Sequence, residues 1–174
     1  MTLHIYPKAG SLPAAMTKIF KEKGGTLLTS TPAQKLIVKD GKVVGVEAVN
    51  VKKEKVTVYA PNVILATGGY NFDEKMVKDL TGIDMVPVGA PGRTGDGIKM
   101  AEAVGAVTVD MTEIQIHPTV EQATSALITE GLRGDGAILV NAEGKRFCDE
   151  VGTRDAVSAA ELAQTGGYAW LVVD

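Results

Sequence analysis

The sequence is short of the features that mark disulfide-bonded, nucleic-acid-binding and membrane-spanning proteins. A single cysteine, Cys148, excludes an intramolecular disulfide and any CxxC metal motif, and we assign no metal ligands. The formal net charge is −3, and no lysine and arginine cluster is interleaved with aromatic residues, so we expect no nucleic-acid partner. No apolar run approaches the roughly 18 residues that span a bilayer, so we expect no membrane span. The first residues also lack the layout of a signal peptide.

A nucleotide-binding fingerprint is also absent. No G-x-G-x-x-G occurs in the chain, and this turn is what positions the pyrophosphate in dinucleotide-binding units. Glycine itself is abundant, at 20 of 174 residues, and much of the excess lies in turns between Gly68 and Gly136. A bulky ligand could meet the backbone at such turns. Apolar and charged contents of 45% and 22% exclude wholesale disorder.

Hydrophobic periodicity predicts a helix near the N-terminus followed by a β-meander. The helix lies between Ser11, a suitable N-cap, and Gly24, a C-terminal stop. One apolar stripe has helical spacing there: Leu12, Ala15, Met16, Ile19 and Phe20. Asp40-Gly41 is a strong hairpin signal, and the charged turn 52–55 leads into a further strand. The strands expected in this part are 26–29, 36–38, 43–51 and 56–58, and the chain also opens in what looks like a strand.

Turns alternate with helices between residues 60 and 112. The elements expected there are a strand at 63–66, helices at 73–80 and 97–105, and a strand at 107–111. The first strand is a continuous apolar run, which is typical of a strand buried on both faces. Asn71 and Glu74 are spaced as a capping pair for the first helix, and Asp96 stands at the start of the second.

The character of the chain changes beyond Glu113, where short strands and loops are expected. Residues 137–140 and 146–148 flank 141–144 as a hairpin. Small residues at helical spacing predict a helix that packs closely: Ala156, Ala159, Ala160 and Ala163. The last residues, 169–174, read as an apolar strand with nothing after it. Both ends therefore look cut, and we place a domain boundary near residue 112.

The segment from His117 to Arg154 gathers the side chains with the most chemistry. It contains His117-Pro118-Thr119, Thr129-Glu130-Gly131-Leu132-Arg133-Gly134, Glu143-Gly144-Lys145-Arg146-Phe147 and Thr153-Arg154-Asp155. Arginine forks bind carboxylates in a bidentate way and stay protonated when partly buried. Such a set of groups suits the binding and protonation of a small dicarboxylic acid.

The order and spacing of these motifs resemble the capping-domain active site of the fumarate reductase and succinate dehydrogenase flavoprotein family, with the soluble flavocytochrome-type fumarate reductases nearest. The resemblance implies an α/β with α+β architecture. Residues 1–112 would be the back part of a glutathione-reductase-like FAD-binding domain, with its β-meander, buried strand and helices. Residues 113–174 would be the first part of an α+β substrate-capping domain.

The resemblance also assigns a cofactor and its contacts. FAD is the implied cofactor, and its contacts would come from two glycine-rich turns: Ala66, Thr67, Gly68 and Gly69 in one, Thr94, Gly95 and Asp96 in the other. Taken alone, Gly68-Gly69 is an ordinary strand-to-loop turn and Asp96 only an N-cap. Because the family's G-x-G-x-x-G fingerprint is missing, we expect FAD binding by this chain alone to be weak or absent.

The family's roles map onto five polar residues. His117 and Thr129 would hold a substrate carboxylate, Arg154 would protonate the substrate, and the relay would run from Glu130 through Arg133 to Arg154. Taken singly, each has an ordinary structural interpretation: a core histidine, a turn threonine and glutamate, a surface arginine, and an arginine paired with Asp155 or Glu150. A second histidine and arginine that grip the far carboxylate in the family do not occur after Arg154.

The expected function is therefore that of a fragment of an FAD-dependent fumarate reductase, with hydride from flavin and a proton from an arginine. The fragment alone is expected to be inactive. The parent would need an electron donor, whether haem, FMN or NADH-linked, and we expect a soluble protein of the bacterial cytoplasm or cell envelope. Two alternatives remain open: a related flavoprotein acting on another enoate or a ketosteroid, and a non-catalytic scaffold.

Overall fold

The computed structural model describes residues 10–174, and the strand expected at the start of the chain lies outside them. Two compact units divide the chain, Met1–Val63 and Ile64–Asp174. The boundary expected near residue 112 lies inside the second unit and stays a prediction. Across residues 10–174, no helix has both the length and the apolar character needed to cross a membrane.

The predicted N-terminal helix is present as α1, Ser11–Glu22. Its N-cap is Gly10 rather than Ser11, which is the first helical residue and makes no capping hydrogen bond. The apolar stripe remains about half exposed, with Phe20 at 48% and Met16 at 60%. Residues 26–29 are irregular, so the strand predicted there is wrong. Without a neighbouring strand, an apolar run of this length has no partner for its backbone N–H and C=O groups.

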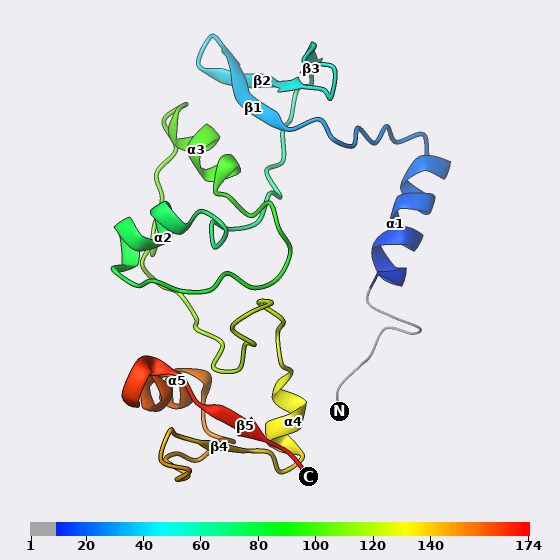
Figure 1. Ribbon diagram of the computed structural model, residues 1–174. Helices are drawn as coiled ribbons and strands as arrows, with labels where there is room; N and C mark the ends of the chain where they lie inside the picture. The colour runs from blue at the N-terminus through cyan, green and yellow to red at the C-terminus, as the bar shows by residue number, and fades with distance from the viewer. Residues whose placement is uncertain (1–9) are drawn as a thin grey trace. The chain divides into compact units, whose positions relative to one another are not determined.

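The predicted meander is confirmed as a three-stranded antiparallel sheet of order β1-β2-β3 (Figure 1). The strands are β1 (Ala33–Lys39), β2 (Lys42–Val49) and β3 (Lys55–Tyr59). Asp40 and Gly41 both adopt positive φ, 51° and 71°, as a two-residue hairpin turn requires. Glu47 on the central strand bridges Lys35 at 3.3 Å and Lys55 at 2.8 Å on its two neighbours, which ties the three strands together.

The second unit begins with two short helices, α2 (Glu74–Thr81) and α3 (Asp96–Glu102), as the sequence predicts. The N-cap of α2 is Asp73, whose Oδ1 accepts from the Met76 amide at 2.9 Å. Asn71 does not cap; its Nδ2 donates to the Val88 carbonyl at 2.8 Å. The predicted capping pair was therefore wrong by two residues, because the neighbouring aspartate competes for the same helix amides.

Two predicted strands in this stretch are wrong. Residues 63–66 and 107–111 are irregular, with Ile64 89% exposed and Val107 94% exposed. An apolar run becomes a buried strand only where flanking strands satisfy its backbone and helices cover its faces. No strand within residues 10–174 pairs with either run. The apolar pattern indicates side chains that favour burial, yet Ile64 and Val107 remain exposed among residues 10–174.

The C-terminal part of the unit packs helices against a small sheet. Its elements are α4 (Glu130–Gly134), β4 (Ile138–Val140), α5 (Arg154–Leu162), the 3-10 turn η1 (Thr165–Gly167) and β5 (Trp170–Val172). Strand β4 pairs with β5 in antiparallel register, Leu139 opposite Leu171. Leu139 and Val157 are the most deeply buried side chains, 2% and 1% exposed. They form the centre of this core.

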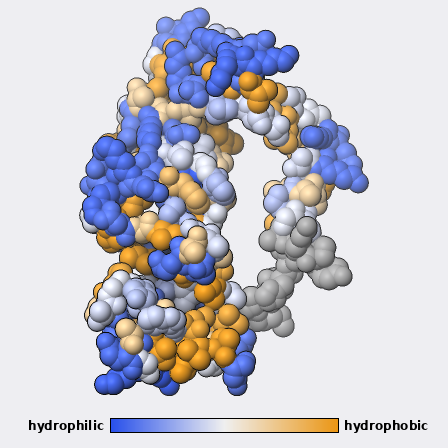
Figure 2. Space-filling view, viewed as in Figure 1, coloured by the Kyte–Doolittle hydropathy of each residue, from blue (hydrophilic) through white to orange (hydrophobic). Residues whose placement is uncertain are grey.

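The predicted hairpin of residues 137–148 is only partly formed. Its turn closes, with Asn141 N–H donating to the Lys145 carbonyl at 3.0 Å, but only one bridge, Val140 to Arg146, connects the two arms. The main partner of β4 is instead β5, at the far end of the sequence. Figure 2 shows hydrophobic surface gathered around this C-terminal sheet, where Trp170, Val172 and Val173 are about half exposed.

Candidate functional site

The two turns expected to contact a cofactor lie against each other. The Gly95 amide donates to the Gly69 carbonyl at 3.2 Å, and Gly68 and Gly95 both have positive φ. Gly97 lies under Thr67 so closely that a Cβ at position 97 would collide with the threonine hydroxyl. Asp96 is not the N-cap; Gly95 holds that position, and no side chain caps α3.

These turns fit one flank of a flavin cofactor. Residues 66–69 form an exposed turn, and a Cβ built on Gly69 would meet nothing within 4 Å, so a ligand can approach the backbone there. The donor set of backbone amides, the Thr67 and Thr94 hydroxyls and the Asp96 carboxylate suits the polar edge of such a group. Lys99 strengthens the cradle by donating to Asp73 at 2.6 Å and to the Thr94 carbonyl at 2.9 Å, which joins α2 to the second turn.

Arg154, Glu130 and Arg133 are brought into one network. Arg154 Nε and Nη2 bind the two carboxylate oxygens of Glu130 at 2.5 and 2.9 Å. Arg133 Nη2 lies 3.5 Å from the same oxygen, Glu130 Oε1. Glu130 therefore contacts both arginines. The order expected from the sequence, with Arg133 in the middle, differs from these contacts because Arg133 lies in α4 with its side chain turned into the core.

The two arginines have very different surroundings. Arg133 is 4% exposed, whereas 38% of the Arg154 side chain is exposed. The Arg154 hydrogen bonds lower the pKa of Glu130 to about 2, so Glu130 is an anion at neutral pH. Glu130 in turn raises the pKa of Arg154, which makes its guanidinium a weak acid in the resting protein.

Gln115 is a member of the network that sequence reasoning missed. Its Oε1 accepts from Arg154 Nη1 at 2.6 Å, so the guanidinium is held on two sides. The only sequence signal was its position two residues before His117, on the same side of an extended segment. With three N–H groups engaged, Arg154 keeps two further N–H donors for a ligand.

The loop between His117 and Thr129 is closed by pairing of the residues Thr119 and Ile128. The Thr119 hydroxyl donates to the Ile128 carbonyl at 2.9 Å, and the Ile128 amide donates back to the Thr119 carbonyl at 3.0 Å. His117 Nδ1 accepts from the Thr119 amide at 3.3 Å. Burial, and then the Arg154 charge, lower the pKa of His117. The imidazole is therefore neutral at pH 7, with its proton on Nε2 and available to a ligand.

Thr129 has a local role that leaves its proton free. It is the N-cap of α4, and its Oγ1 accepts from the Gly131 amide at 3.3 Å. The hydroxyl hydrogen is not used in that contact, so Thr129 can donate to an anion. The cap also fixes the direction in which Glu130, the first residue of α4, projects.

A second ion pair lies behind Arg133, and sequence reasoning left its residues unassigned. Glu150 is 2% exposed and accepts a fork from Arg146, with Nε at 3.0 Å from both oxygens and Nη2 at 2.6 Å from Oε2. Burial by itself raises the pKa of Glu150, but the Arg146 fork and the Leu139 amide outweigh it and the net pKa is lowered. The i,i+4 spacing of Arg146 and Glu150 was the available signal.

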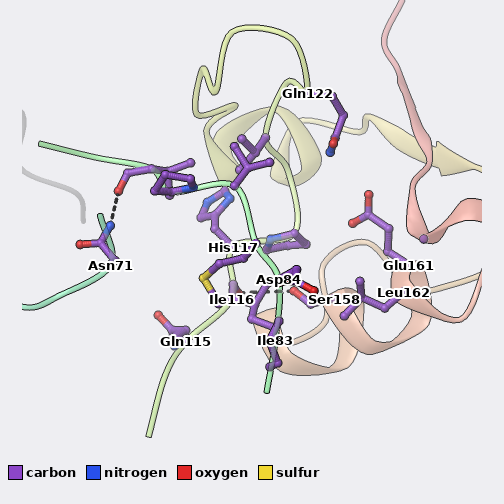
Figure 3. A pocket seen from close by; sticks show the side chains of 17 residues that line it. Asn71, Ile83, Asp84, Gln115, Ile116, His117, Gln122, Ser158, Glu161 and Leu162 are labelled. Carbon is purple, nitrogen blue, oxygen red and sulfur yellow. Dashed lines mark hydrogen bonds between the residues drawn. The ribbon is translucent and has the colours of Figure 1, made fainter. Parts of the chain in front are cut away.

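A cavity of about 240 Å³ adjoins His117 (Figure 3). In that view His117 lies between Asn71 on one side and Ser158, Glu161 and Leu162 of α5 on the other. Gln115 also lines the cavity, but Thr129, Glu130, Arg133 and Arg154 do not. Of the five predicted catalytic and substrate-binding residues, His117 is the one that lines this cavity.

The chain is similar to curated proteins whose names describe fumarate reduction. It is 44% identical over 169 residues to the NADH:fumarate oxidoreductase of Klebsiella pneumoniae (strain 342), which covers 95% of this chain and 18% of that protein. It is 44% identical over 142 residues to the fumarate reductase (cytochrome) of Shewanella frigidimarina, which covers 79% of this chain and 25% of that protein. The chain thus spans about a fifth to a quarter of the length of these relatives.

A solved structure and a family model agree with these relatives. The open conformation of a flavocytochrome c3 fumarate reductase matches with a TM-score of 0.81 and 35% identity, over 97% of this chain and 31% of that one. The family described as FAD binding domain matches residues 6–174, which include both glycine-rich turns and the Arg154 network. The chain belongs to this FAD-binding family, among the fumarate reductase and succinate dehydrogenase flavoproteins, and the cofactor of the parent flavoprotein is FAD.

Proposed function

We propose that this chain is part of an FAD-dependent oxidoreductase that reduces fumarate, or a similar enoic dicarboxylate, to succinate. The observation that carries the proposal is the Arg154 guanidinium, held in a fixed orientation by Glu130 and Gln115. Two of its N–H donors are left for a ligand. A cation fixed in this way suits both the binding of a carboxylate and the delivery of a proton.

His117 and Thr129 would supply neutral donors to the same substrate. The Nε2–H of neutral His117 and the hydroxyl hydrogen of Thr129 can both donate to a carboxylate. Because neither adds charge, they orient the substrate while Arg154 provides the electrostatic attraction. Retention of both His117 and Thr129 favours a carboxylate substrate over a ketosteroid.

FAD would be held by the turns 66–69 and 94–96, and when bound it supplies the hydride. The saturated product also needs a proton on the adjacent carbon. Negative charge develops on that carbon and its carboxylate as the double bond is reduced, and the fixed Arg154 cation stabilises it. The same charge makes the carbon basic enough to take a proton from Arg154, which is otherwise too weak an acid.

The return of a proton to Arg154 uses Glu130. In the resting protein the pKa of Glu130 is about 2 chiefly because Arg154 donates to it and carries a positive charge. Once Arg154 gives up its proton, that cause disappears and the affinity of the Glu130 carboxylate for a proton rises. Glu130 has 44% of its side chain exposed, so it can take the replacement proton from solvent, while the Arg133 cation lies 3.5 Å from it. The relay we propose therefore comprises Arg133, Glu130 and Arg154, and the proton enters from solvent at Glu130 and passes to Arg154.

The domain assignment follows the same proposal. Residues 1–112 would belong to a glutathione-reductase-like FAD-binding domain, and residues 113–174 would begin an α+β capping domain that carries the relay. Electrons would reach the flavin from a haem, FMN or NADH-linked donor elsewhere in the full-length protein. The relatives whose names include NADH and cytochrome support a donor of this kind.

A substrate panel on the full-length flavoprotein tests the proposal. Reduced viologen would serve as electron donor, with fumarate, a monocarboxylic enoate and a 3-ketosteroid as acceptors. We expect fumarate to have the highest kcat/KM. Preference for the monocarboxylate or the steroid would assign the related reductase activity instead. A full-length protein that binds no flavin would be the non-catalytic scaffold.

A further inference from the structure

The buried pair of Arg146 and Glu150 is joined to the proton relay by a single backbone atom. Arg133 Nη1 donates to the carbonyl oxygen of Glu150 at 2.6 Å. Within residues 10–174 this is the hydrogen bond that the Arg133 side chain makes, since its 3.5 Å contact with Glu130 is an ion pair only. Within residues 10–174, the buried Nε of Arg133 has no hydrogen-bond partner. The location of the Arg133 side chain therefore depends mainly on where the Glu150 carbonyl lies.

The Glu150 backbone is in turn held through the Glu150 side chain. Oε1 accepts from the Leu139 amide of β4 at 2.8 Å, and the Arg146 fork neutralises the carboxylate. An unpaired carboxylate at 2% exposure would be strongly disfavoured, so loss of the fork would drive this side chain toward solvent. The backbone carbonyl would move with it.

The same short segment also positions Arg154. Only three residues lie between Glu150 and Arg154, which begins α5. The turn between them is tight, since the Gly152 amide donates to the Asp149 carbonyl at 3.1 Å. A shift at Glu150 would therefore affect Arg133 directly and Arg154 through the chain.

We propose that Arg146 and Glu150 are positioning residues for the proton relay, because together they fix the carbonyl that holds Arg133 against Glu130. The inference rests on the proposed function, and it assigns to Arg146 a role that its exposed location on a hairpin does not indicate. Neither residue needs to touch the substrate.

The test uses the full-length flavoprotein and the variants Arg146→Lys and Glu150→Gln. Lysine keeps the charge but not the fork, and glutamine keeps an acceptor for the Leu139 amide but not the charge. Lys145→Met is the matched control, because Lys145 is the exposed neighbour of Arg146 and its side chain makes no hydrogen bond or salt bridge with residues 10–174. For each protein, kcat, KM for fumarate, the solvent deuterium isotope effect on kcat, FAD content and Tm are measured.

We expect Arg146→Lys to lower kcat about tenfold with little change in KM or FAD content, since small misplacements of catalytic groups are costly. The solvent isotope effect on kcat should rise as proton return becomes limiting, and Glu150→Gln should act in the same direction. Lys145→Met should match the unaltered protein.

Two results would overturn the inference. One is an unchanged kcat in both variants. The other is a kcat that falls only in proportion to FAD content or Tm with the isotope effect unchanged, which indicates a purely structural role. The Arg154→Lys variant, measured in the same assay, tests whether Arg154 is the proton donor. If that variant also keeps full activity, the proton-donor role of Arg154 fails and the positioning role falls with it, whereas the proposed function itself fails only if the substrate panel shows no preference for fumarate.

Discussion

Replacement of Arg154 by lysine in the full-length flavoprotein separates proton donation from substrate binding. Arg154 is held by three hydrogen bonds that it donates, two to Glu130 and one to Gln115. A lysine ammonium carries the same charge on one nitrogen and cannot reproduce this planar arrangement. The attraction to a substrate carboxylate largely survives the change, whereas the fixed donor position does not.

The size of the effect follows from this geometry. A positioned general acid contributes about 10²–10⁴ in rate, and lysine retains a proton but loses its placement. We therefore expect kcat to fall on the order of 10²-fold, with kcat/KM falling in parallel, because the lost interaction acts in the transition state. KM for fumarate should change little, since the ground-state charge is retained.

The assay is steady-state oxidation of reduced viologen by fumarate at saturating donor. Lys145→Arg serves as the control, because it changes the same pair of residue types at an exposed hairpin position. FAD content and Tm of each protein show whether the variant is correctly folded. A raised KM with an unchanged kcat would refute the reasoning, since Arg154 would then be a binding residue and not the proton donor.

Three further predictions concern other groups. Glu130→Gln should lower kcat less than Arg154→Lys, because water can partly replace a partly exposed relay member. The pKa of Glu130 in the folded protein is below its ordinary 4.5, so its contribution to stability is present above pH 4.5 and is lost as pH falls toward about 2. This pH dependence of Tm should vanish in the variant. Gly69→Ala should leave the Tm of the cofactor-free protein unchanged, since a Cβ there meets nothing within 4 Å. The same Cβ would obstruct a cofactor that approaches the backbone, so FAD binding should weaken about tenfold, as measured by flavin fluorescence titration. Burial raises the pKa of Glu161 to about 7, so the folded state binds more protons than the unfolded state between pH 4.5 and 7, and stability falls as pH rises through that window. Glu161→Gln should remove this fall and raise the free energy of unfolding at pH 8 by about 1–2 kcal/mol. Urea denaturation at several pH values measures this change.

Local patterns predicted the elements whose partners are close in sequence. The stripe of α1 and the Asp40-Gly41 turn of the meander each specify a structure that needs only a few neighbouring residues. The runs at 63–66 and 107–111 failed for the opposite reason. Their strand character depends on distant partners that are not present among residues 10–174.

The sequence by itself determined which chemical groups are available and in what order they occur. It pointed to Arg154, Glu130, Arg133, His117 and Thr129 and to a family, because motif order along the chain is a property of the sequence alone. It did not predict α4: where the sequence pattern indicated a turn, Thr129 caps a short helix through its own side chain.

Only the tertiary structure decided how these groups are connected. It brought Glu130 into contact with both arginines, added Gln115 to the Arg154 fork, and joined Arg146 and Glu150 to Arg133 through one carbonyl. It also paired β4 with β5, about thirty residues further along the chain, in place of the adjacent arm of the hairpin. The physical reason is that hydrogen bonds and ion pairs depend on distances of a few ångströms between residues far apart in sequence, and packing of the core around Leu139 and Val157 sets those distances.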